Sequence, residues 1–534
     1  MFLDQDAAGC YAFFVSIFLQ SDKRQRKPKI LRVGSTNQLT NYKLMQTKSF
    51  LKKLLITPCV LAMVLLGAGC SKKDGLSGTE ELSLSGAKNA VKTSALHTYY
   101  VSPSGSDTNP GTISQPFLTI QRAQTAAVAG DDIYVRGGTY VMQESQIART
   151  ETLYSIVTYL NKSGTAGAPI RYMAYPGESP VFDYSNVKPA AHRVTAFLVA
   201  GSYIHIKGLD VKGVQVTITG HTQSECFRNE GSNNIYEALK MHDGMANGFY
   251  LTKGGNNLIL NCDAYRNWDT VSEDGLGGNV DGFGCHPYKQ GSGWTGNVFR
   301  GCRAWFNSDD GFDCITAFEA ITFENCWSFY NGYSPSFQPL ANGLGFKIGG
   351  FGVSTTPTVP ATIPRHIVRF CLAAHNRTAG FYANHHLGGI DWINNTAYNN
   401  PINYNMLNRA SDYQSDVAGY GHTLYNNLSY MPGSSHMVNI NYSQCTASNN
   451  SFQLSNITIS DADFTGVNES LLTYNRHSDF TLYSNLAFLR LVSGSDLIDK
   501  GVNQGYTYTG ASPDLGCFEY GISKSPIASG PVIQ

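Results

Sequence analysis

The stretch that decides the fold runs from Asp281 to Lys347 and repeats one short unit: Asp281-Gly282-Phe283, Asp310-Gly311-Phe312 and Leu344-Gly345-Phe346. The Gly-Phe pair begins at residues 248, 282, 311, 345 and 380, with spacings of 34, 29, 34 and 35 residues. A fixed period in this range is typical of a solenoid whose turns stack on one another. Equivalent residues of neighbouring turns should therefore lie one strand spacing apart, about 4.8 Å.

A second repeat follows short alternating segments that have the pattern of strands. These segments are residues 203–206, 257–260, 320–323, 366–369 and 389–392. All but the first closely precede a six-residue unit that starts with Cys and ends with Asn; the units are 262–267, 302–307, 326–331, 371–376 and, with Asn in place of Cys, 395–400. We expect the cysteines to pack in the core, rather than in disulfides or a zinc site, and the asparagines to form a ladder at a turn. The sequence therefore predicts an all-β protein, a right-handed parallel β-helix.

The two ends of the solenoid need covers, because an open end exposes apolar surface and strand edges. Residues 98–102 have the pattern of an opening strand, and a short helix is expected from Pro116 to near Gly130 as the N-terminal cap. Residues 513–519 are expected to close the other end.

The chain before the β-helix has the pattern of an export signal. Lys52 and Lys53 precede a mostly apolar run from Leu54 to Leu66, which is too short to span a bilayer. The residues up to Cys70 resemble a bacterial lipoprotein box, which implies lipid attachment at Cys70. We therefore expect residues 1–44 to be an extension from an upstream start site, 45–70 a signal peptide, 71–96 a flexible tether and 97–534 the β-helix domain. The alternative is a cytoplasmic tail on an anchor helix.

Charge limits the classes of partner. The whole chain carries 39 basic and 39 acidic residues, but the segment to Cys70 holds 10 basic and 3 acidic ones, which leaves a net charge of −7 for the rest. This balance argues against nucleic acid as a partner. Contact with a membrane is expected through the lipid alone, at the outer membrane of a bacterial cell envelope, and the protein is expected to be a monomer.

An acidic group lies at the centre of the repeat. Stacking places Asp281 directly beneath Asp310, with Asp309 and Asp313 beside it, and Lys347 one turn above Asp313. Like charges this close raise the free energy unless a cation neutralises them, and four carboxylates suit Ca²⁺. The longer turns carry insertions at 270–278 and 332–342, which we expect to form the walls of a substrate groove.

The motifs around these residues resemble those of polysaccharide lyase family 9. They are Asp281-Gly282-Phe283, residues 308–313, Gly345-Phe346-Lys347, residues 301–305 and residues 394–398, and the match is dense over about 235–405, the expected catalytic core. The resemblance implies a right-handed parallel β-helix that binds calcium through Asp281, Asp309, Asp310 and Asp313 and uses Lys347 as the base. It also implies β-elimination of an acidic pectin polysaccharide, either homogalacturonan or rhamnogalacturonan-I, to give 4,5-unsaturated uronate ends.

The chemistry of the residues is consistent with these roles. The C5 proton of a uronate is acidified by the adjacent carboxylate, which calcium can bind, and nearby calcium and burial both favour a neutral lysine. Arg377 and His385, close to the same face in sequence, are candidate substrate-binding residues.

Two other functions share some of these features. A β-helix glycoside hydrolase of the polygalacturonase type also uses paired carboxylates, but its Gly-His-Gly motif is absent, because Gly421-His422 is followed by Thr423. A non-catalytic β-helix that binds calcium or glycan would explain the aspartates and leave Lys347 without a role.

Overall fold

The computed structural model describes residues 96–220, 223–272, 274–482 and 486–522. The predicted extension, the signal peptide with Cys70 and nearly all of the predicted tether lie outside these residues. Within the described ranges, no helix is both long and apolar enough to cross a membrane.

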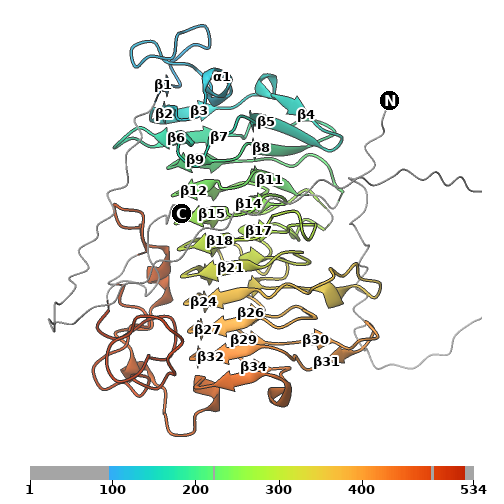
Figure 1. The fold of residues 1–534 in the computed structure, drawn as a ribbon, viewed down its shortest axis with the longest axis vertical. Helices are drawn as coiled ribbons and strands as arrows, with labels where there is room; N and C mark the ends of the chain where they lie inside the picture. Colours follow the sequence, from blue (N-terminus) through green and yellow to red (C-terminus); the bar gives the residue numbers. More distant parts are fainter. Residues whose placement is uncertain (1–95, 221–222, 273, 483–485, 523–534) are drawn as a thin grey trace, which may run out of the picture. The chain divides into compact units, whose positions relative to one another are not determined.

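The β-helix domain is a stack of coils whose strands form three long sheets, here called A, B and C (Figure 1). Sheet A contains β1 (Thr98–Val101), β2 (Asp132–Val135), β6 (Ile170–Ala174), β9 (Ile204–Lys207), β12 (Ile235–Glu237), β15 (Leu258–Leu260), β18 (Asn297–Arg300), β21 (Ile321–Glu324), β24 (Ile367–Arg369), β27 (Asp391–Ile393), β32 (Thr423–Tyr425) and β35 (Thr446–Ser448). Sheet B contains β3 (Gly138–Val141), β7 (Pro180–Asp183), β10 (Asp210–Lys212), β13 (Lys240–His242), β16 (Asp263–Tyr265), β19 (Arg303–Trp305), β22 (Trp327–Phe329), β25 (Leu372–Ala374), β28 (Thr396–Tyr398) and β33 (Leu428–Tyr430).

Sheet C carries the acidic repeat. It contains β4 (Arg149–Thr150), β5 (Tyr154–Leu160), β8 (Arg193–Val199), β11 (Ser224–Asn229), β14 (Ala246–Leu251), β17 (Phe283–Cys285), β20 (Phe312–Asp313), β23 (Leu344–Lys347), β26 (Ala379–Tyr382), β29 (Ile402–Asn405) and β34 (Ser435–Val438). Neighbouring strands of the three sheets run parallel, except that β4 pairs antiparallel with β5; β30 (Asn408–Arg409) and β31 (Asp416–Val417) form a separate antiparallel pair. The prediction of a parallel β-helix is confirmed.

The predicted capping helix is α1 (Ile120–Ala126), at the N-terminal end of the stack in Figure 1. The Thr119 side chain accepts a hydrogen bond from the backbone N–H of Arg122, which caps the first turn. Ile120 and Ala123 are buried in the main core. The helix ends four residues before Gly130, because Ala127 already has an extended backbone. Short 3₁₀ turns occur at η1 (Glu144–Gln146), η2 (Phe351–Val353), η3 (Tyr442–Gln444), η4 (Ser451–Gln453), η5 (Asp461–Asp463) and η6 (Glu469–Thr473).

The Gly-Phe repeat sets the register of sheet C. Phe283 pairs with Phe312, and Phe312 with Phe346, while their buried rings stack with centroids 5.0 and 4.8 Å apart. The residue before each phenylalanine has no room for a side chain, because a Cβ on Gly282 would lie 2.7 Å from the Cβ of Ala304. The pair thus supplies a large core ring and a close approach to sheet B at every turn.

The cysteine and asparagine columns also lie where the repeat predicts. The nine cysteines of the described residues are all free, and the four of the repeat are fully buried. The side-chain amide of Asn307 donates to Asn331 at 3.1 Å, and that of Asn331 donates to Asn376 at 3.0 Å. The buried asparagines therefore form the predicted ladder, in which each amide satisfies its neighbour.

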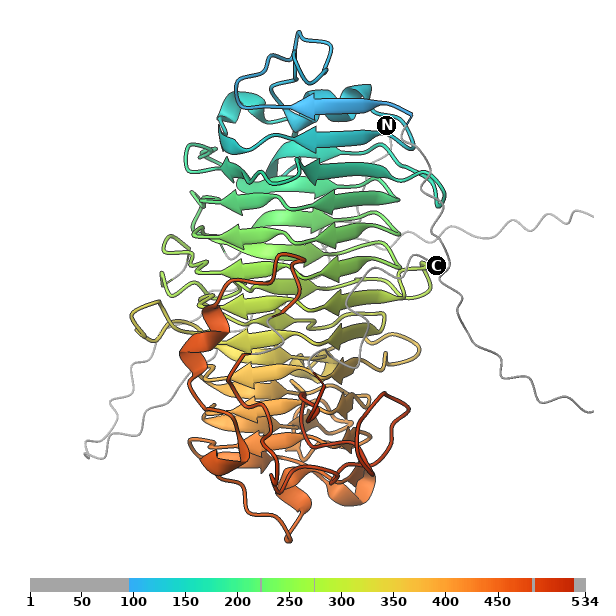
Figure 2. The ribbon, with the colours of Figure 1, turned by 90° about the vertical axis from the view of Figure 1, so that its left-hand side faces the viewer.

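The predicted closing cap is wrong in its position. The segment that contains residues 513–519 runs along the flank of the β-helix beside sheet B (Figure 2): the backbone N–H of Cys517 donates to Thr396, and Phe518 contacts Trp327. Farther along the stack, Arg476 pairs with Asp263 at 2.6 Å. We call residues 451–522, apart from the undescribed 483–485, the C-terminal strap. It covers a second hydrophobic cluster on the outside of sheet B.

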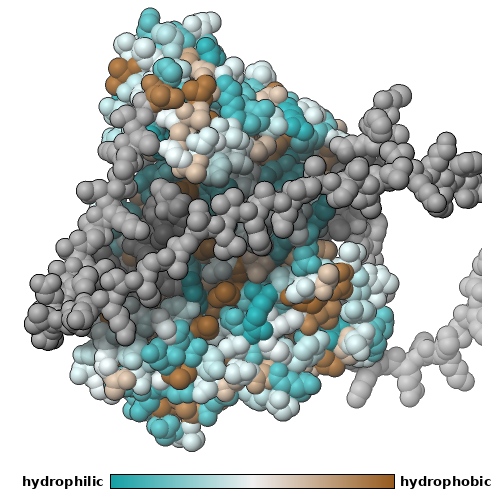
Figure 3. Space-filling view, in the orientation of Figure 1, coloured by the Kyte–Doolittle hydropathy of each residue, from teal (hydrophilic) through white to brown (hydrophobic). Residues whose placement is uncertain are grey.

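On the face drawn in Figure 3, hydrophobic residues are scattered among hydrophilic ones. This distribution is expected when the apolar side chains of the repeat point into the stack and under the strap.

Candidate active site

The predicted acidic group forms on three successive strands of sheet C. Asp281 lies two residues before β17, Asp310 lies two residues before β20, and Asp313 ends β20. Asp313 pairs with Gly284 on one side and with Lys347, the last residue of β23, on the other. The stacked columns derived from the repeat are therefore confirmed.

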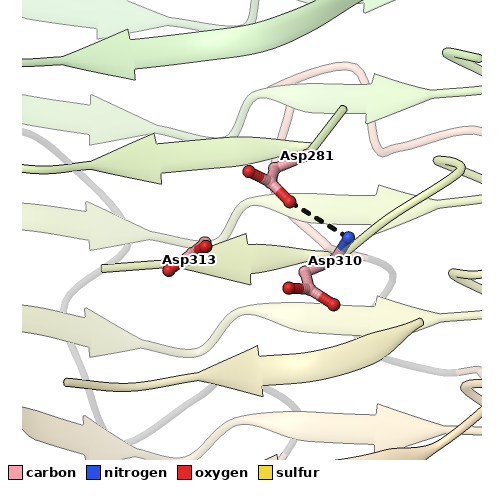
Figure 4. A group of neighbouring side chains, drawn as sticks. All are labelled: Asp281, Asp310 and Asp313. Atoms are coloured by element: carbon pink, nitrogen blue, oxygen red, sulfur yellow. Dashed lines mark hydrogen bonds between the residues drawn. The ribbon is translucent and has the colours of Figure 1, made fainter. Parts of the chain in front are cut away.

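Three carboxylates converge between these strands. Asp281, Asp310 and Asp313 are 4, 0 and 5% exposed, and one oxygen of each lies within 4.8 Å of the other two. Figure 4 shows the three side chains and the hydrogen bond from the Asp310 backbone N–H to Asp281 Oδ1, 3.1 Å long. A buried group of three carboxylates at this spacing is a plausible donor set for a cation.

Backbone amides also fix the other two carboxylates. Asp313 Oδ1 accepts from the N–H of Ile315 at 2.6 Å, and Asp310 Oδ1 accepts from the N–H of Leu344 at 2.8 Å. The second oxygen of Asp310 is buried and lies 3.1 Å from Lys347 Nζ, at an angle that makes an ion pair but no directed hydrogen bond. It is therefore an acceptor with unused capacity inside the group, and the site fits an oxygen-binding cation on this ground as well.

Asp309 has different contacts. Its carboxylate accepts from the backbone N–H of Asn279, which directly follows the 270–278 loop, at 2.7 Å, and from that of Asn342, which ends the 332–342 loop, at 2.9 Å. It lies near enough to the other aspartates to raise the pKa of Asp310, but it is not one of the three convergent carboxylates. Its role as a fourth cation ligand stays a prediction, and its visible role is to hold both loops beside the site.

The electrostatics reflect burial and mutual repulsion. Burial, followed by the nearby carboxylates, raises the pKa of Asp281, and burial with the Asp309 charge raises the pKa of Asp310 to about 8. In the absence of a cation, at least one of these groups therefore keeps a proton near neutral pH.

Lys347 reaches into the same group. Its Nζ lies 3.1 Å from Asp310 Oδ2 and 3.0 Å from Asp313 Oδ2, and its side chain is 13% exposed. Burial lowers the pKa of this lysine, but the four aspartates outweigh burial and raise it well above its ordinary value. The aspartates alone therefore keep Lys347 in its charged form.

The two predicted substrate-binding residues lie on either side of β26. The Arg377 guanidinium donates to the backbone carbonyl of Ala341 at 2.8 Å and so anchors the 332–342 loop. His385 lies between Tyr382 and Asp416, with its Nε2 3.2 Å from the carboxylate. Neither contact tests substrate binding, which stays a prediction for both residues.

Two further residues of this site were not singled out by the sequence. Asn247, in the column of Asp281 and one strand away, accepts the Asp281 backbone N–H at 2.7 Å, and Tyr382 pairs with Lys347 across β23 and β26. Both occupy positions flanking a Gly-Phe pair, so the column alignment contained the signal.

A cavity of about 850 Å³ lies elsewhere, at the last coils. It is lined by Tyr430, His436, Tyr442, Phe452 and neighbouring residues, and none of its lining residues is an aspartate, a glutamate, a lysine or an arginine. It is separate from the acidic group.

Comparison with known proteins identifies the family of this chain. Residues 99–427 match the family described as "Pel9A-like, right handed beta helix region". The chain belongs to this family. Pectate lyase L of Dickeya chrysanthemi is 35% identical over 428 residues, which cover 79% of this chain and 90% of the relative.

Two solved structures that are similar to this chain support the same family. A rhamnogalacturonan lyase is 50% identical, with a TM-score of 0.71, and the alignment covers 74% of this chain and 97% of that one. The pectate lyase Pel9A is 31% identical, with a TM-score of 0.64 and coverage of 80 and 97%. The predicted right-handed β-helix and the predicted polysaccharide lyase are both confirmed for this member of the Pel9A-like family.

Proposed function

We propose that the protein is a calcium-dependent lyase that cleaves a galacturonate-containing pectin backbone by β-elimination, with Lys347 as the base. The observation that carries the proposal is the juxtaposition of Lys347 with three convergent buried carboxylates on adjacent strands. A hydrolase needs an acid and a base, and a binding module needs no lysine here, whereas elimination uses all four groups.

Asp281, Asp310 and Asp313 would hold the cation, with Asp309 close beside them. Bound there, Ca²⁺ would supply positive charge to the uronate carboxylate of the substrate and to the negative charge that develops when the C5 proton is removed. The aspartates are pre-positioned for this role, because backbone N–H groups of Ile315 and Leu344 already fix two of them.

Lys347 takes the C5 proton through Nζ, for which the amine must be neutral. The four aspartates oppose this by raising the pKa of Lys347. Once their charges are neutralised, the burial of the lysine favours the neutral amine. Lys347 is therefore a competent base only when the aspartates are engaged, so activity and calcium occupancy should rise together.

The substrate is either homogalacturonan or the rhamnogalacturonan-I backbone, since both contain galacturonate. The rhamnogalacturonan lyase is 50% identical to this chain and the pectate lyases named above 31 and 35%, which favours rhamnogalacturonan-I.

Ultraviolet absorbance of the unsaturated uronate product tests the proposal. We expect absorbance to rise on one of the two polymers with calcium and to vanish with a chelator. Lys347→Ala should abolish turnover, whereas the matched control Lys253→Ala, which removes a lysine paired with Glu230, should retain it. New reducing ends without absorbance would indicate a hydrolase, and unchanged turnover in Lys347→Ala would refute the lysine mechanism.

We also propose that the enzyme is attached to the bacterial cell envelope through lipid on Cys70, at the outer membrane. The basic residues and apolar run before Cys70 support this location. Expressed from its full sequence, the protein should fractionate with membranes, and Cys70→Ser should release it; membrane association that survives this change would contradict the proposal.

A further inference from the structure

The elimination proposed above needs a second proton transfer. When the bond between C4 and the glycosidic oxygen breaks, that oxygen leaves with the electron pair and must gain a proton. Asp281, Asp310 and Asp313 cannot supply it while they hold a cation, and Lys347 is occupied with the C5 proton. The donor must therefore be sought among the neighbours of Lys347.

The register of sheet C restricts the choice. On sheet C, Lys347 of β23 pairs with Asp313 of β20 on one side and with Tyr382 of β26 on the other. The column of Asp281, Asp310 and Leu344 continues on β26 with Ala379. The side chain of Ala379 has no proton that it could donate. Tyr382 is thus a neutral proton-bearing side chain on the strand next to the base, and neighbouring strands lie about 4.8 Å apart.

A chain of polar contacts begins at the Tyr382 hydroxyl. The hydroxyl lies 3.4 Å from His385 Nδ1, and His385 Nε2 lies 3.2 Å from Asp416 Oδ1. Arg409 contacts the same Asp416 oxygen at 2.6 Å. Because Nε2 faces a carboxylate, it carries the ring hydrogen, which leaves Nδ1 toward the tyrosine.

The charges around Tyr382 suit a donor. The ring is partly exposed, and burial raises its pKa to about 12, while Lys347 and Arg409 act to lower the pKa and Asp416 and Asp310 act to raise it. The hydroxyl therefore keeps its proton over the neutral and mildly alkaline range.

We propose that Tyr382 donates its hydroxyl proton to the leaving glycosidic oxygen, an inference that depends on the proposed elimination. The C5–H bond breaks and its proton passes to Lys347 Nζ. The electron pair left on C5 forms the C4=C5 double bond, the C4–O bond breaks, and the departing oxygen takes the proton of Tyr382. The phenolate then regains a proton from solvent.

Tyr382→Phe tests the inference, since it removes the hydroxyl and keeps the ring. Wild type is assayed first by product absorbance with calcium; no absorbance would refute the proposed lyase itself. If wild type is active, we expect kcat of Tyr382→Phe to fall by roughly 10²–10⁴-fold. KM and the calcium concentration for half-maximal activity should change less than twofold.

The matched control is Tyr250→Phe. Tyr250 stands in the same column on β14 but three strands, about 14 Å, from Lys347, so its kcat should stay within threefold of wild type. A fall of less than tenfold in kcat of Tyr382→Phe would overturn the assignment. A larger fall would also overturn it if KM rose or the unfolding temperature dropped in parallel, because a structural role would then explain the loss.

Discussion

Replacing Asp310 by Asn should change the stability of the protein in opposite directions with and without calcium. Asn is isosteric and keeps an oxygen to accept the 2.8 Å hydrogen bond from the Leu344 N–H. In a chelator, burial and Asp309 raise the pKa of Asp310 to about 8, from its ordinary value near 4. The difference between these two pKa values corresponds to about 5 kcal/mol, the largest contribution that this proton can make to stability.

The sign follows from proton linkage. The native state holds the Asp310 proton up to about pH 8, whereas the unfolded chain releases it near pH 4. Calcium-free wild type therefore loses stability as pH rises from about 4 to 8. Asn has no proton to lose, so in chelator at pH 9 the variant should be more stable than wild type by up to several kcal/mol, and by much less at pH 5.

Calcium should reverse the order. With calcium bound as proposed, a concentration of 100 times its Kd should stabilise wild type by about 2.7 kcal/mol, which for roughly 420 ordered residues is about 3 °C in unfolding temperature. Asp310→Asn should lose most of this gain. Thermal unfolding followed by circular dichroism at pH 5 and 9, with calcium or chelator, measures all four states, and the exposed Asp412→Asn is the control. If Asp310→Asn is less stable than wild type in chelator at pH 9, the buried-charge reasoning is wrong.

Three further predictions concern the scaffold. Phe312→Ala removes a buried ring stacked between Phe283 and Phe346 and should cost about 3–5 kcal/mol in urea unfolding; a cost below 1 kcal/mol would contradict its place in the core. Asn331→Ala breaks the asparagine ladder and should cost about 1–3 kcal/mol by the same measurement, because buried partners lose their hydrogen bonds. Burial lowers the pKa of His386 to about 4 and of His422 to about 3, so these rings are neutral in the native state and their stabilising contribution, complete above pH 6.5, is lost as pH falls toward 4. Unfolding temperatures between pH 7 and 4 should therefore fall, and His386→Gln should flatten the decline; an unchanged slope would count against this origin.

The period of the sequence predicted most of the fold, because each coil repeats the same space-filling problem. Gly282 and Phe283 contact residues at positions equivalent to those that Gly311 and Phe312 contact one coil farther on. One sequence spacing therefore places every coil in register. The same spacing also predicts that Lys347 lies beside Asp313, as it does on β23 and β20. The position of a residue in a stacked column can therefore be predicted from the spacing of the repeat.

Side-chain direction at the bends does not follow from counting. Asp309 and Asp310 are adjacent, yet one carboxylate binds loop amides and the other joins the convergent group. The chain turns between β19 and β20, and there the two-residue alternation of a strand no longer applies. The strap was missed for a related reason: after residue 450 the repeat ends, and contacts such as Cys517 with Thr396 join residues that share no period.

The C-terminal strap also affects how the protein unfolds. Most contacts of a solenoid link adjacent coils, so coils can in principle open one at a time from an end. Here Arg303 and Arg476 both contact Asp263, while Phe518 contacts Trp327, so one segment bridges coils from β16 to β22. Opening any of these coils alone would expose buried charge, and the coils that carry the aspartates and Lys347 lie within this span. The strap should therefore make these coils unfold as one cooperative unit, so that the acidic group is lost in a single step rather than by gradual fraying.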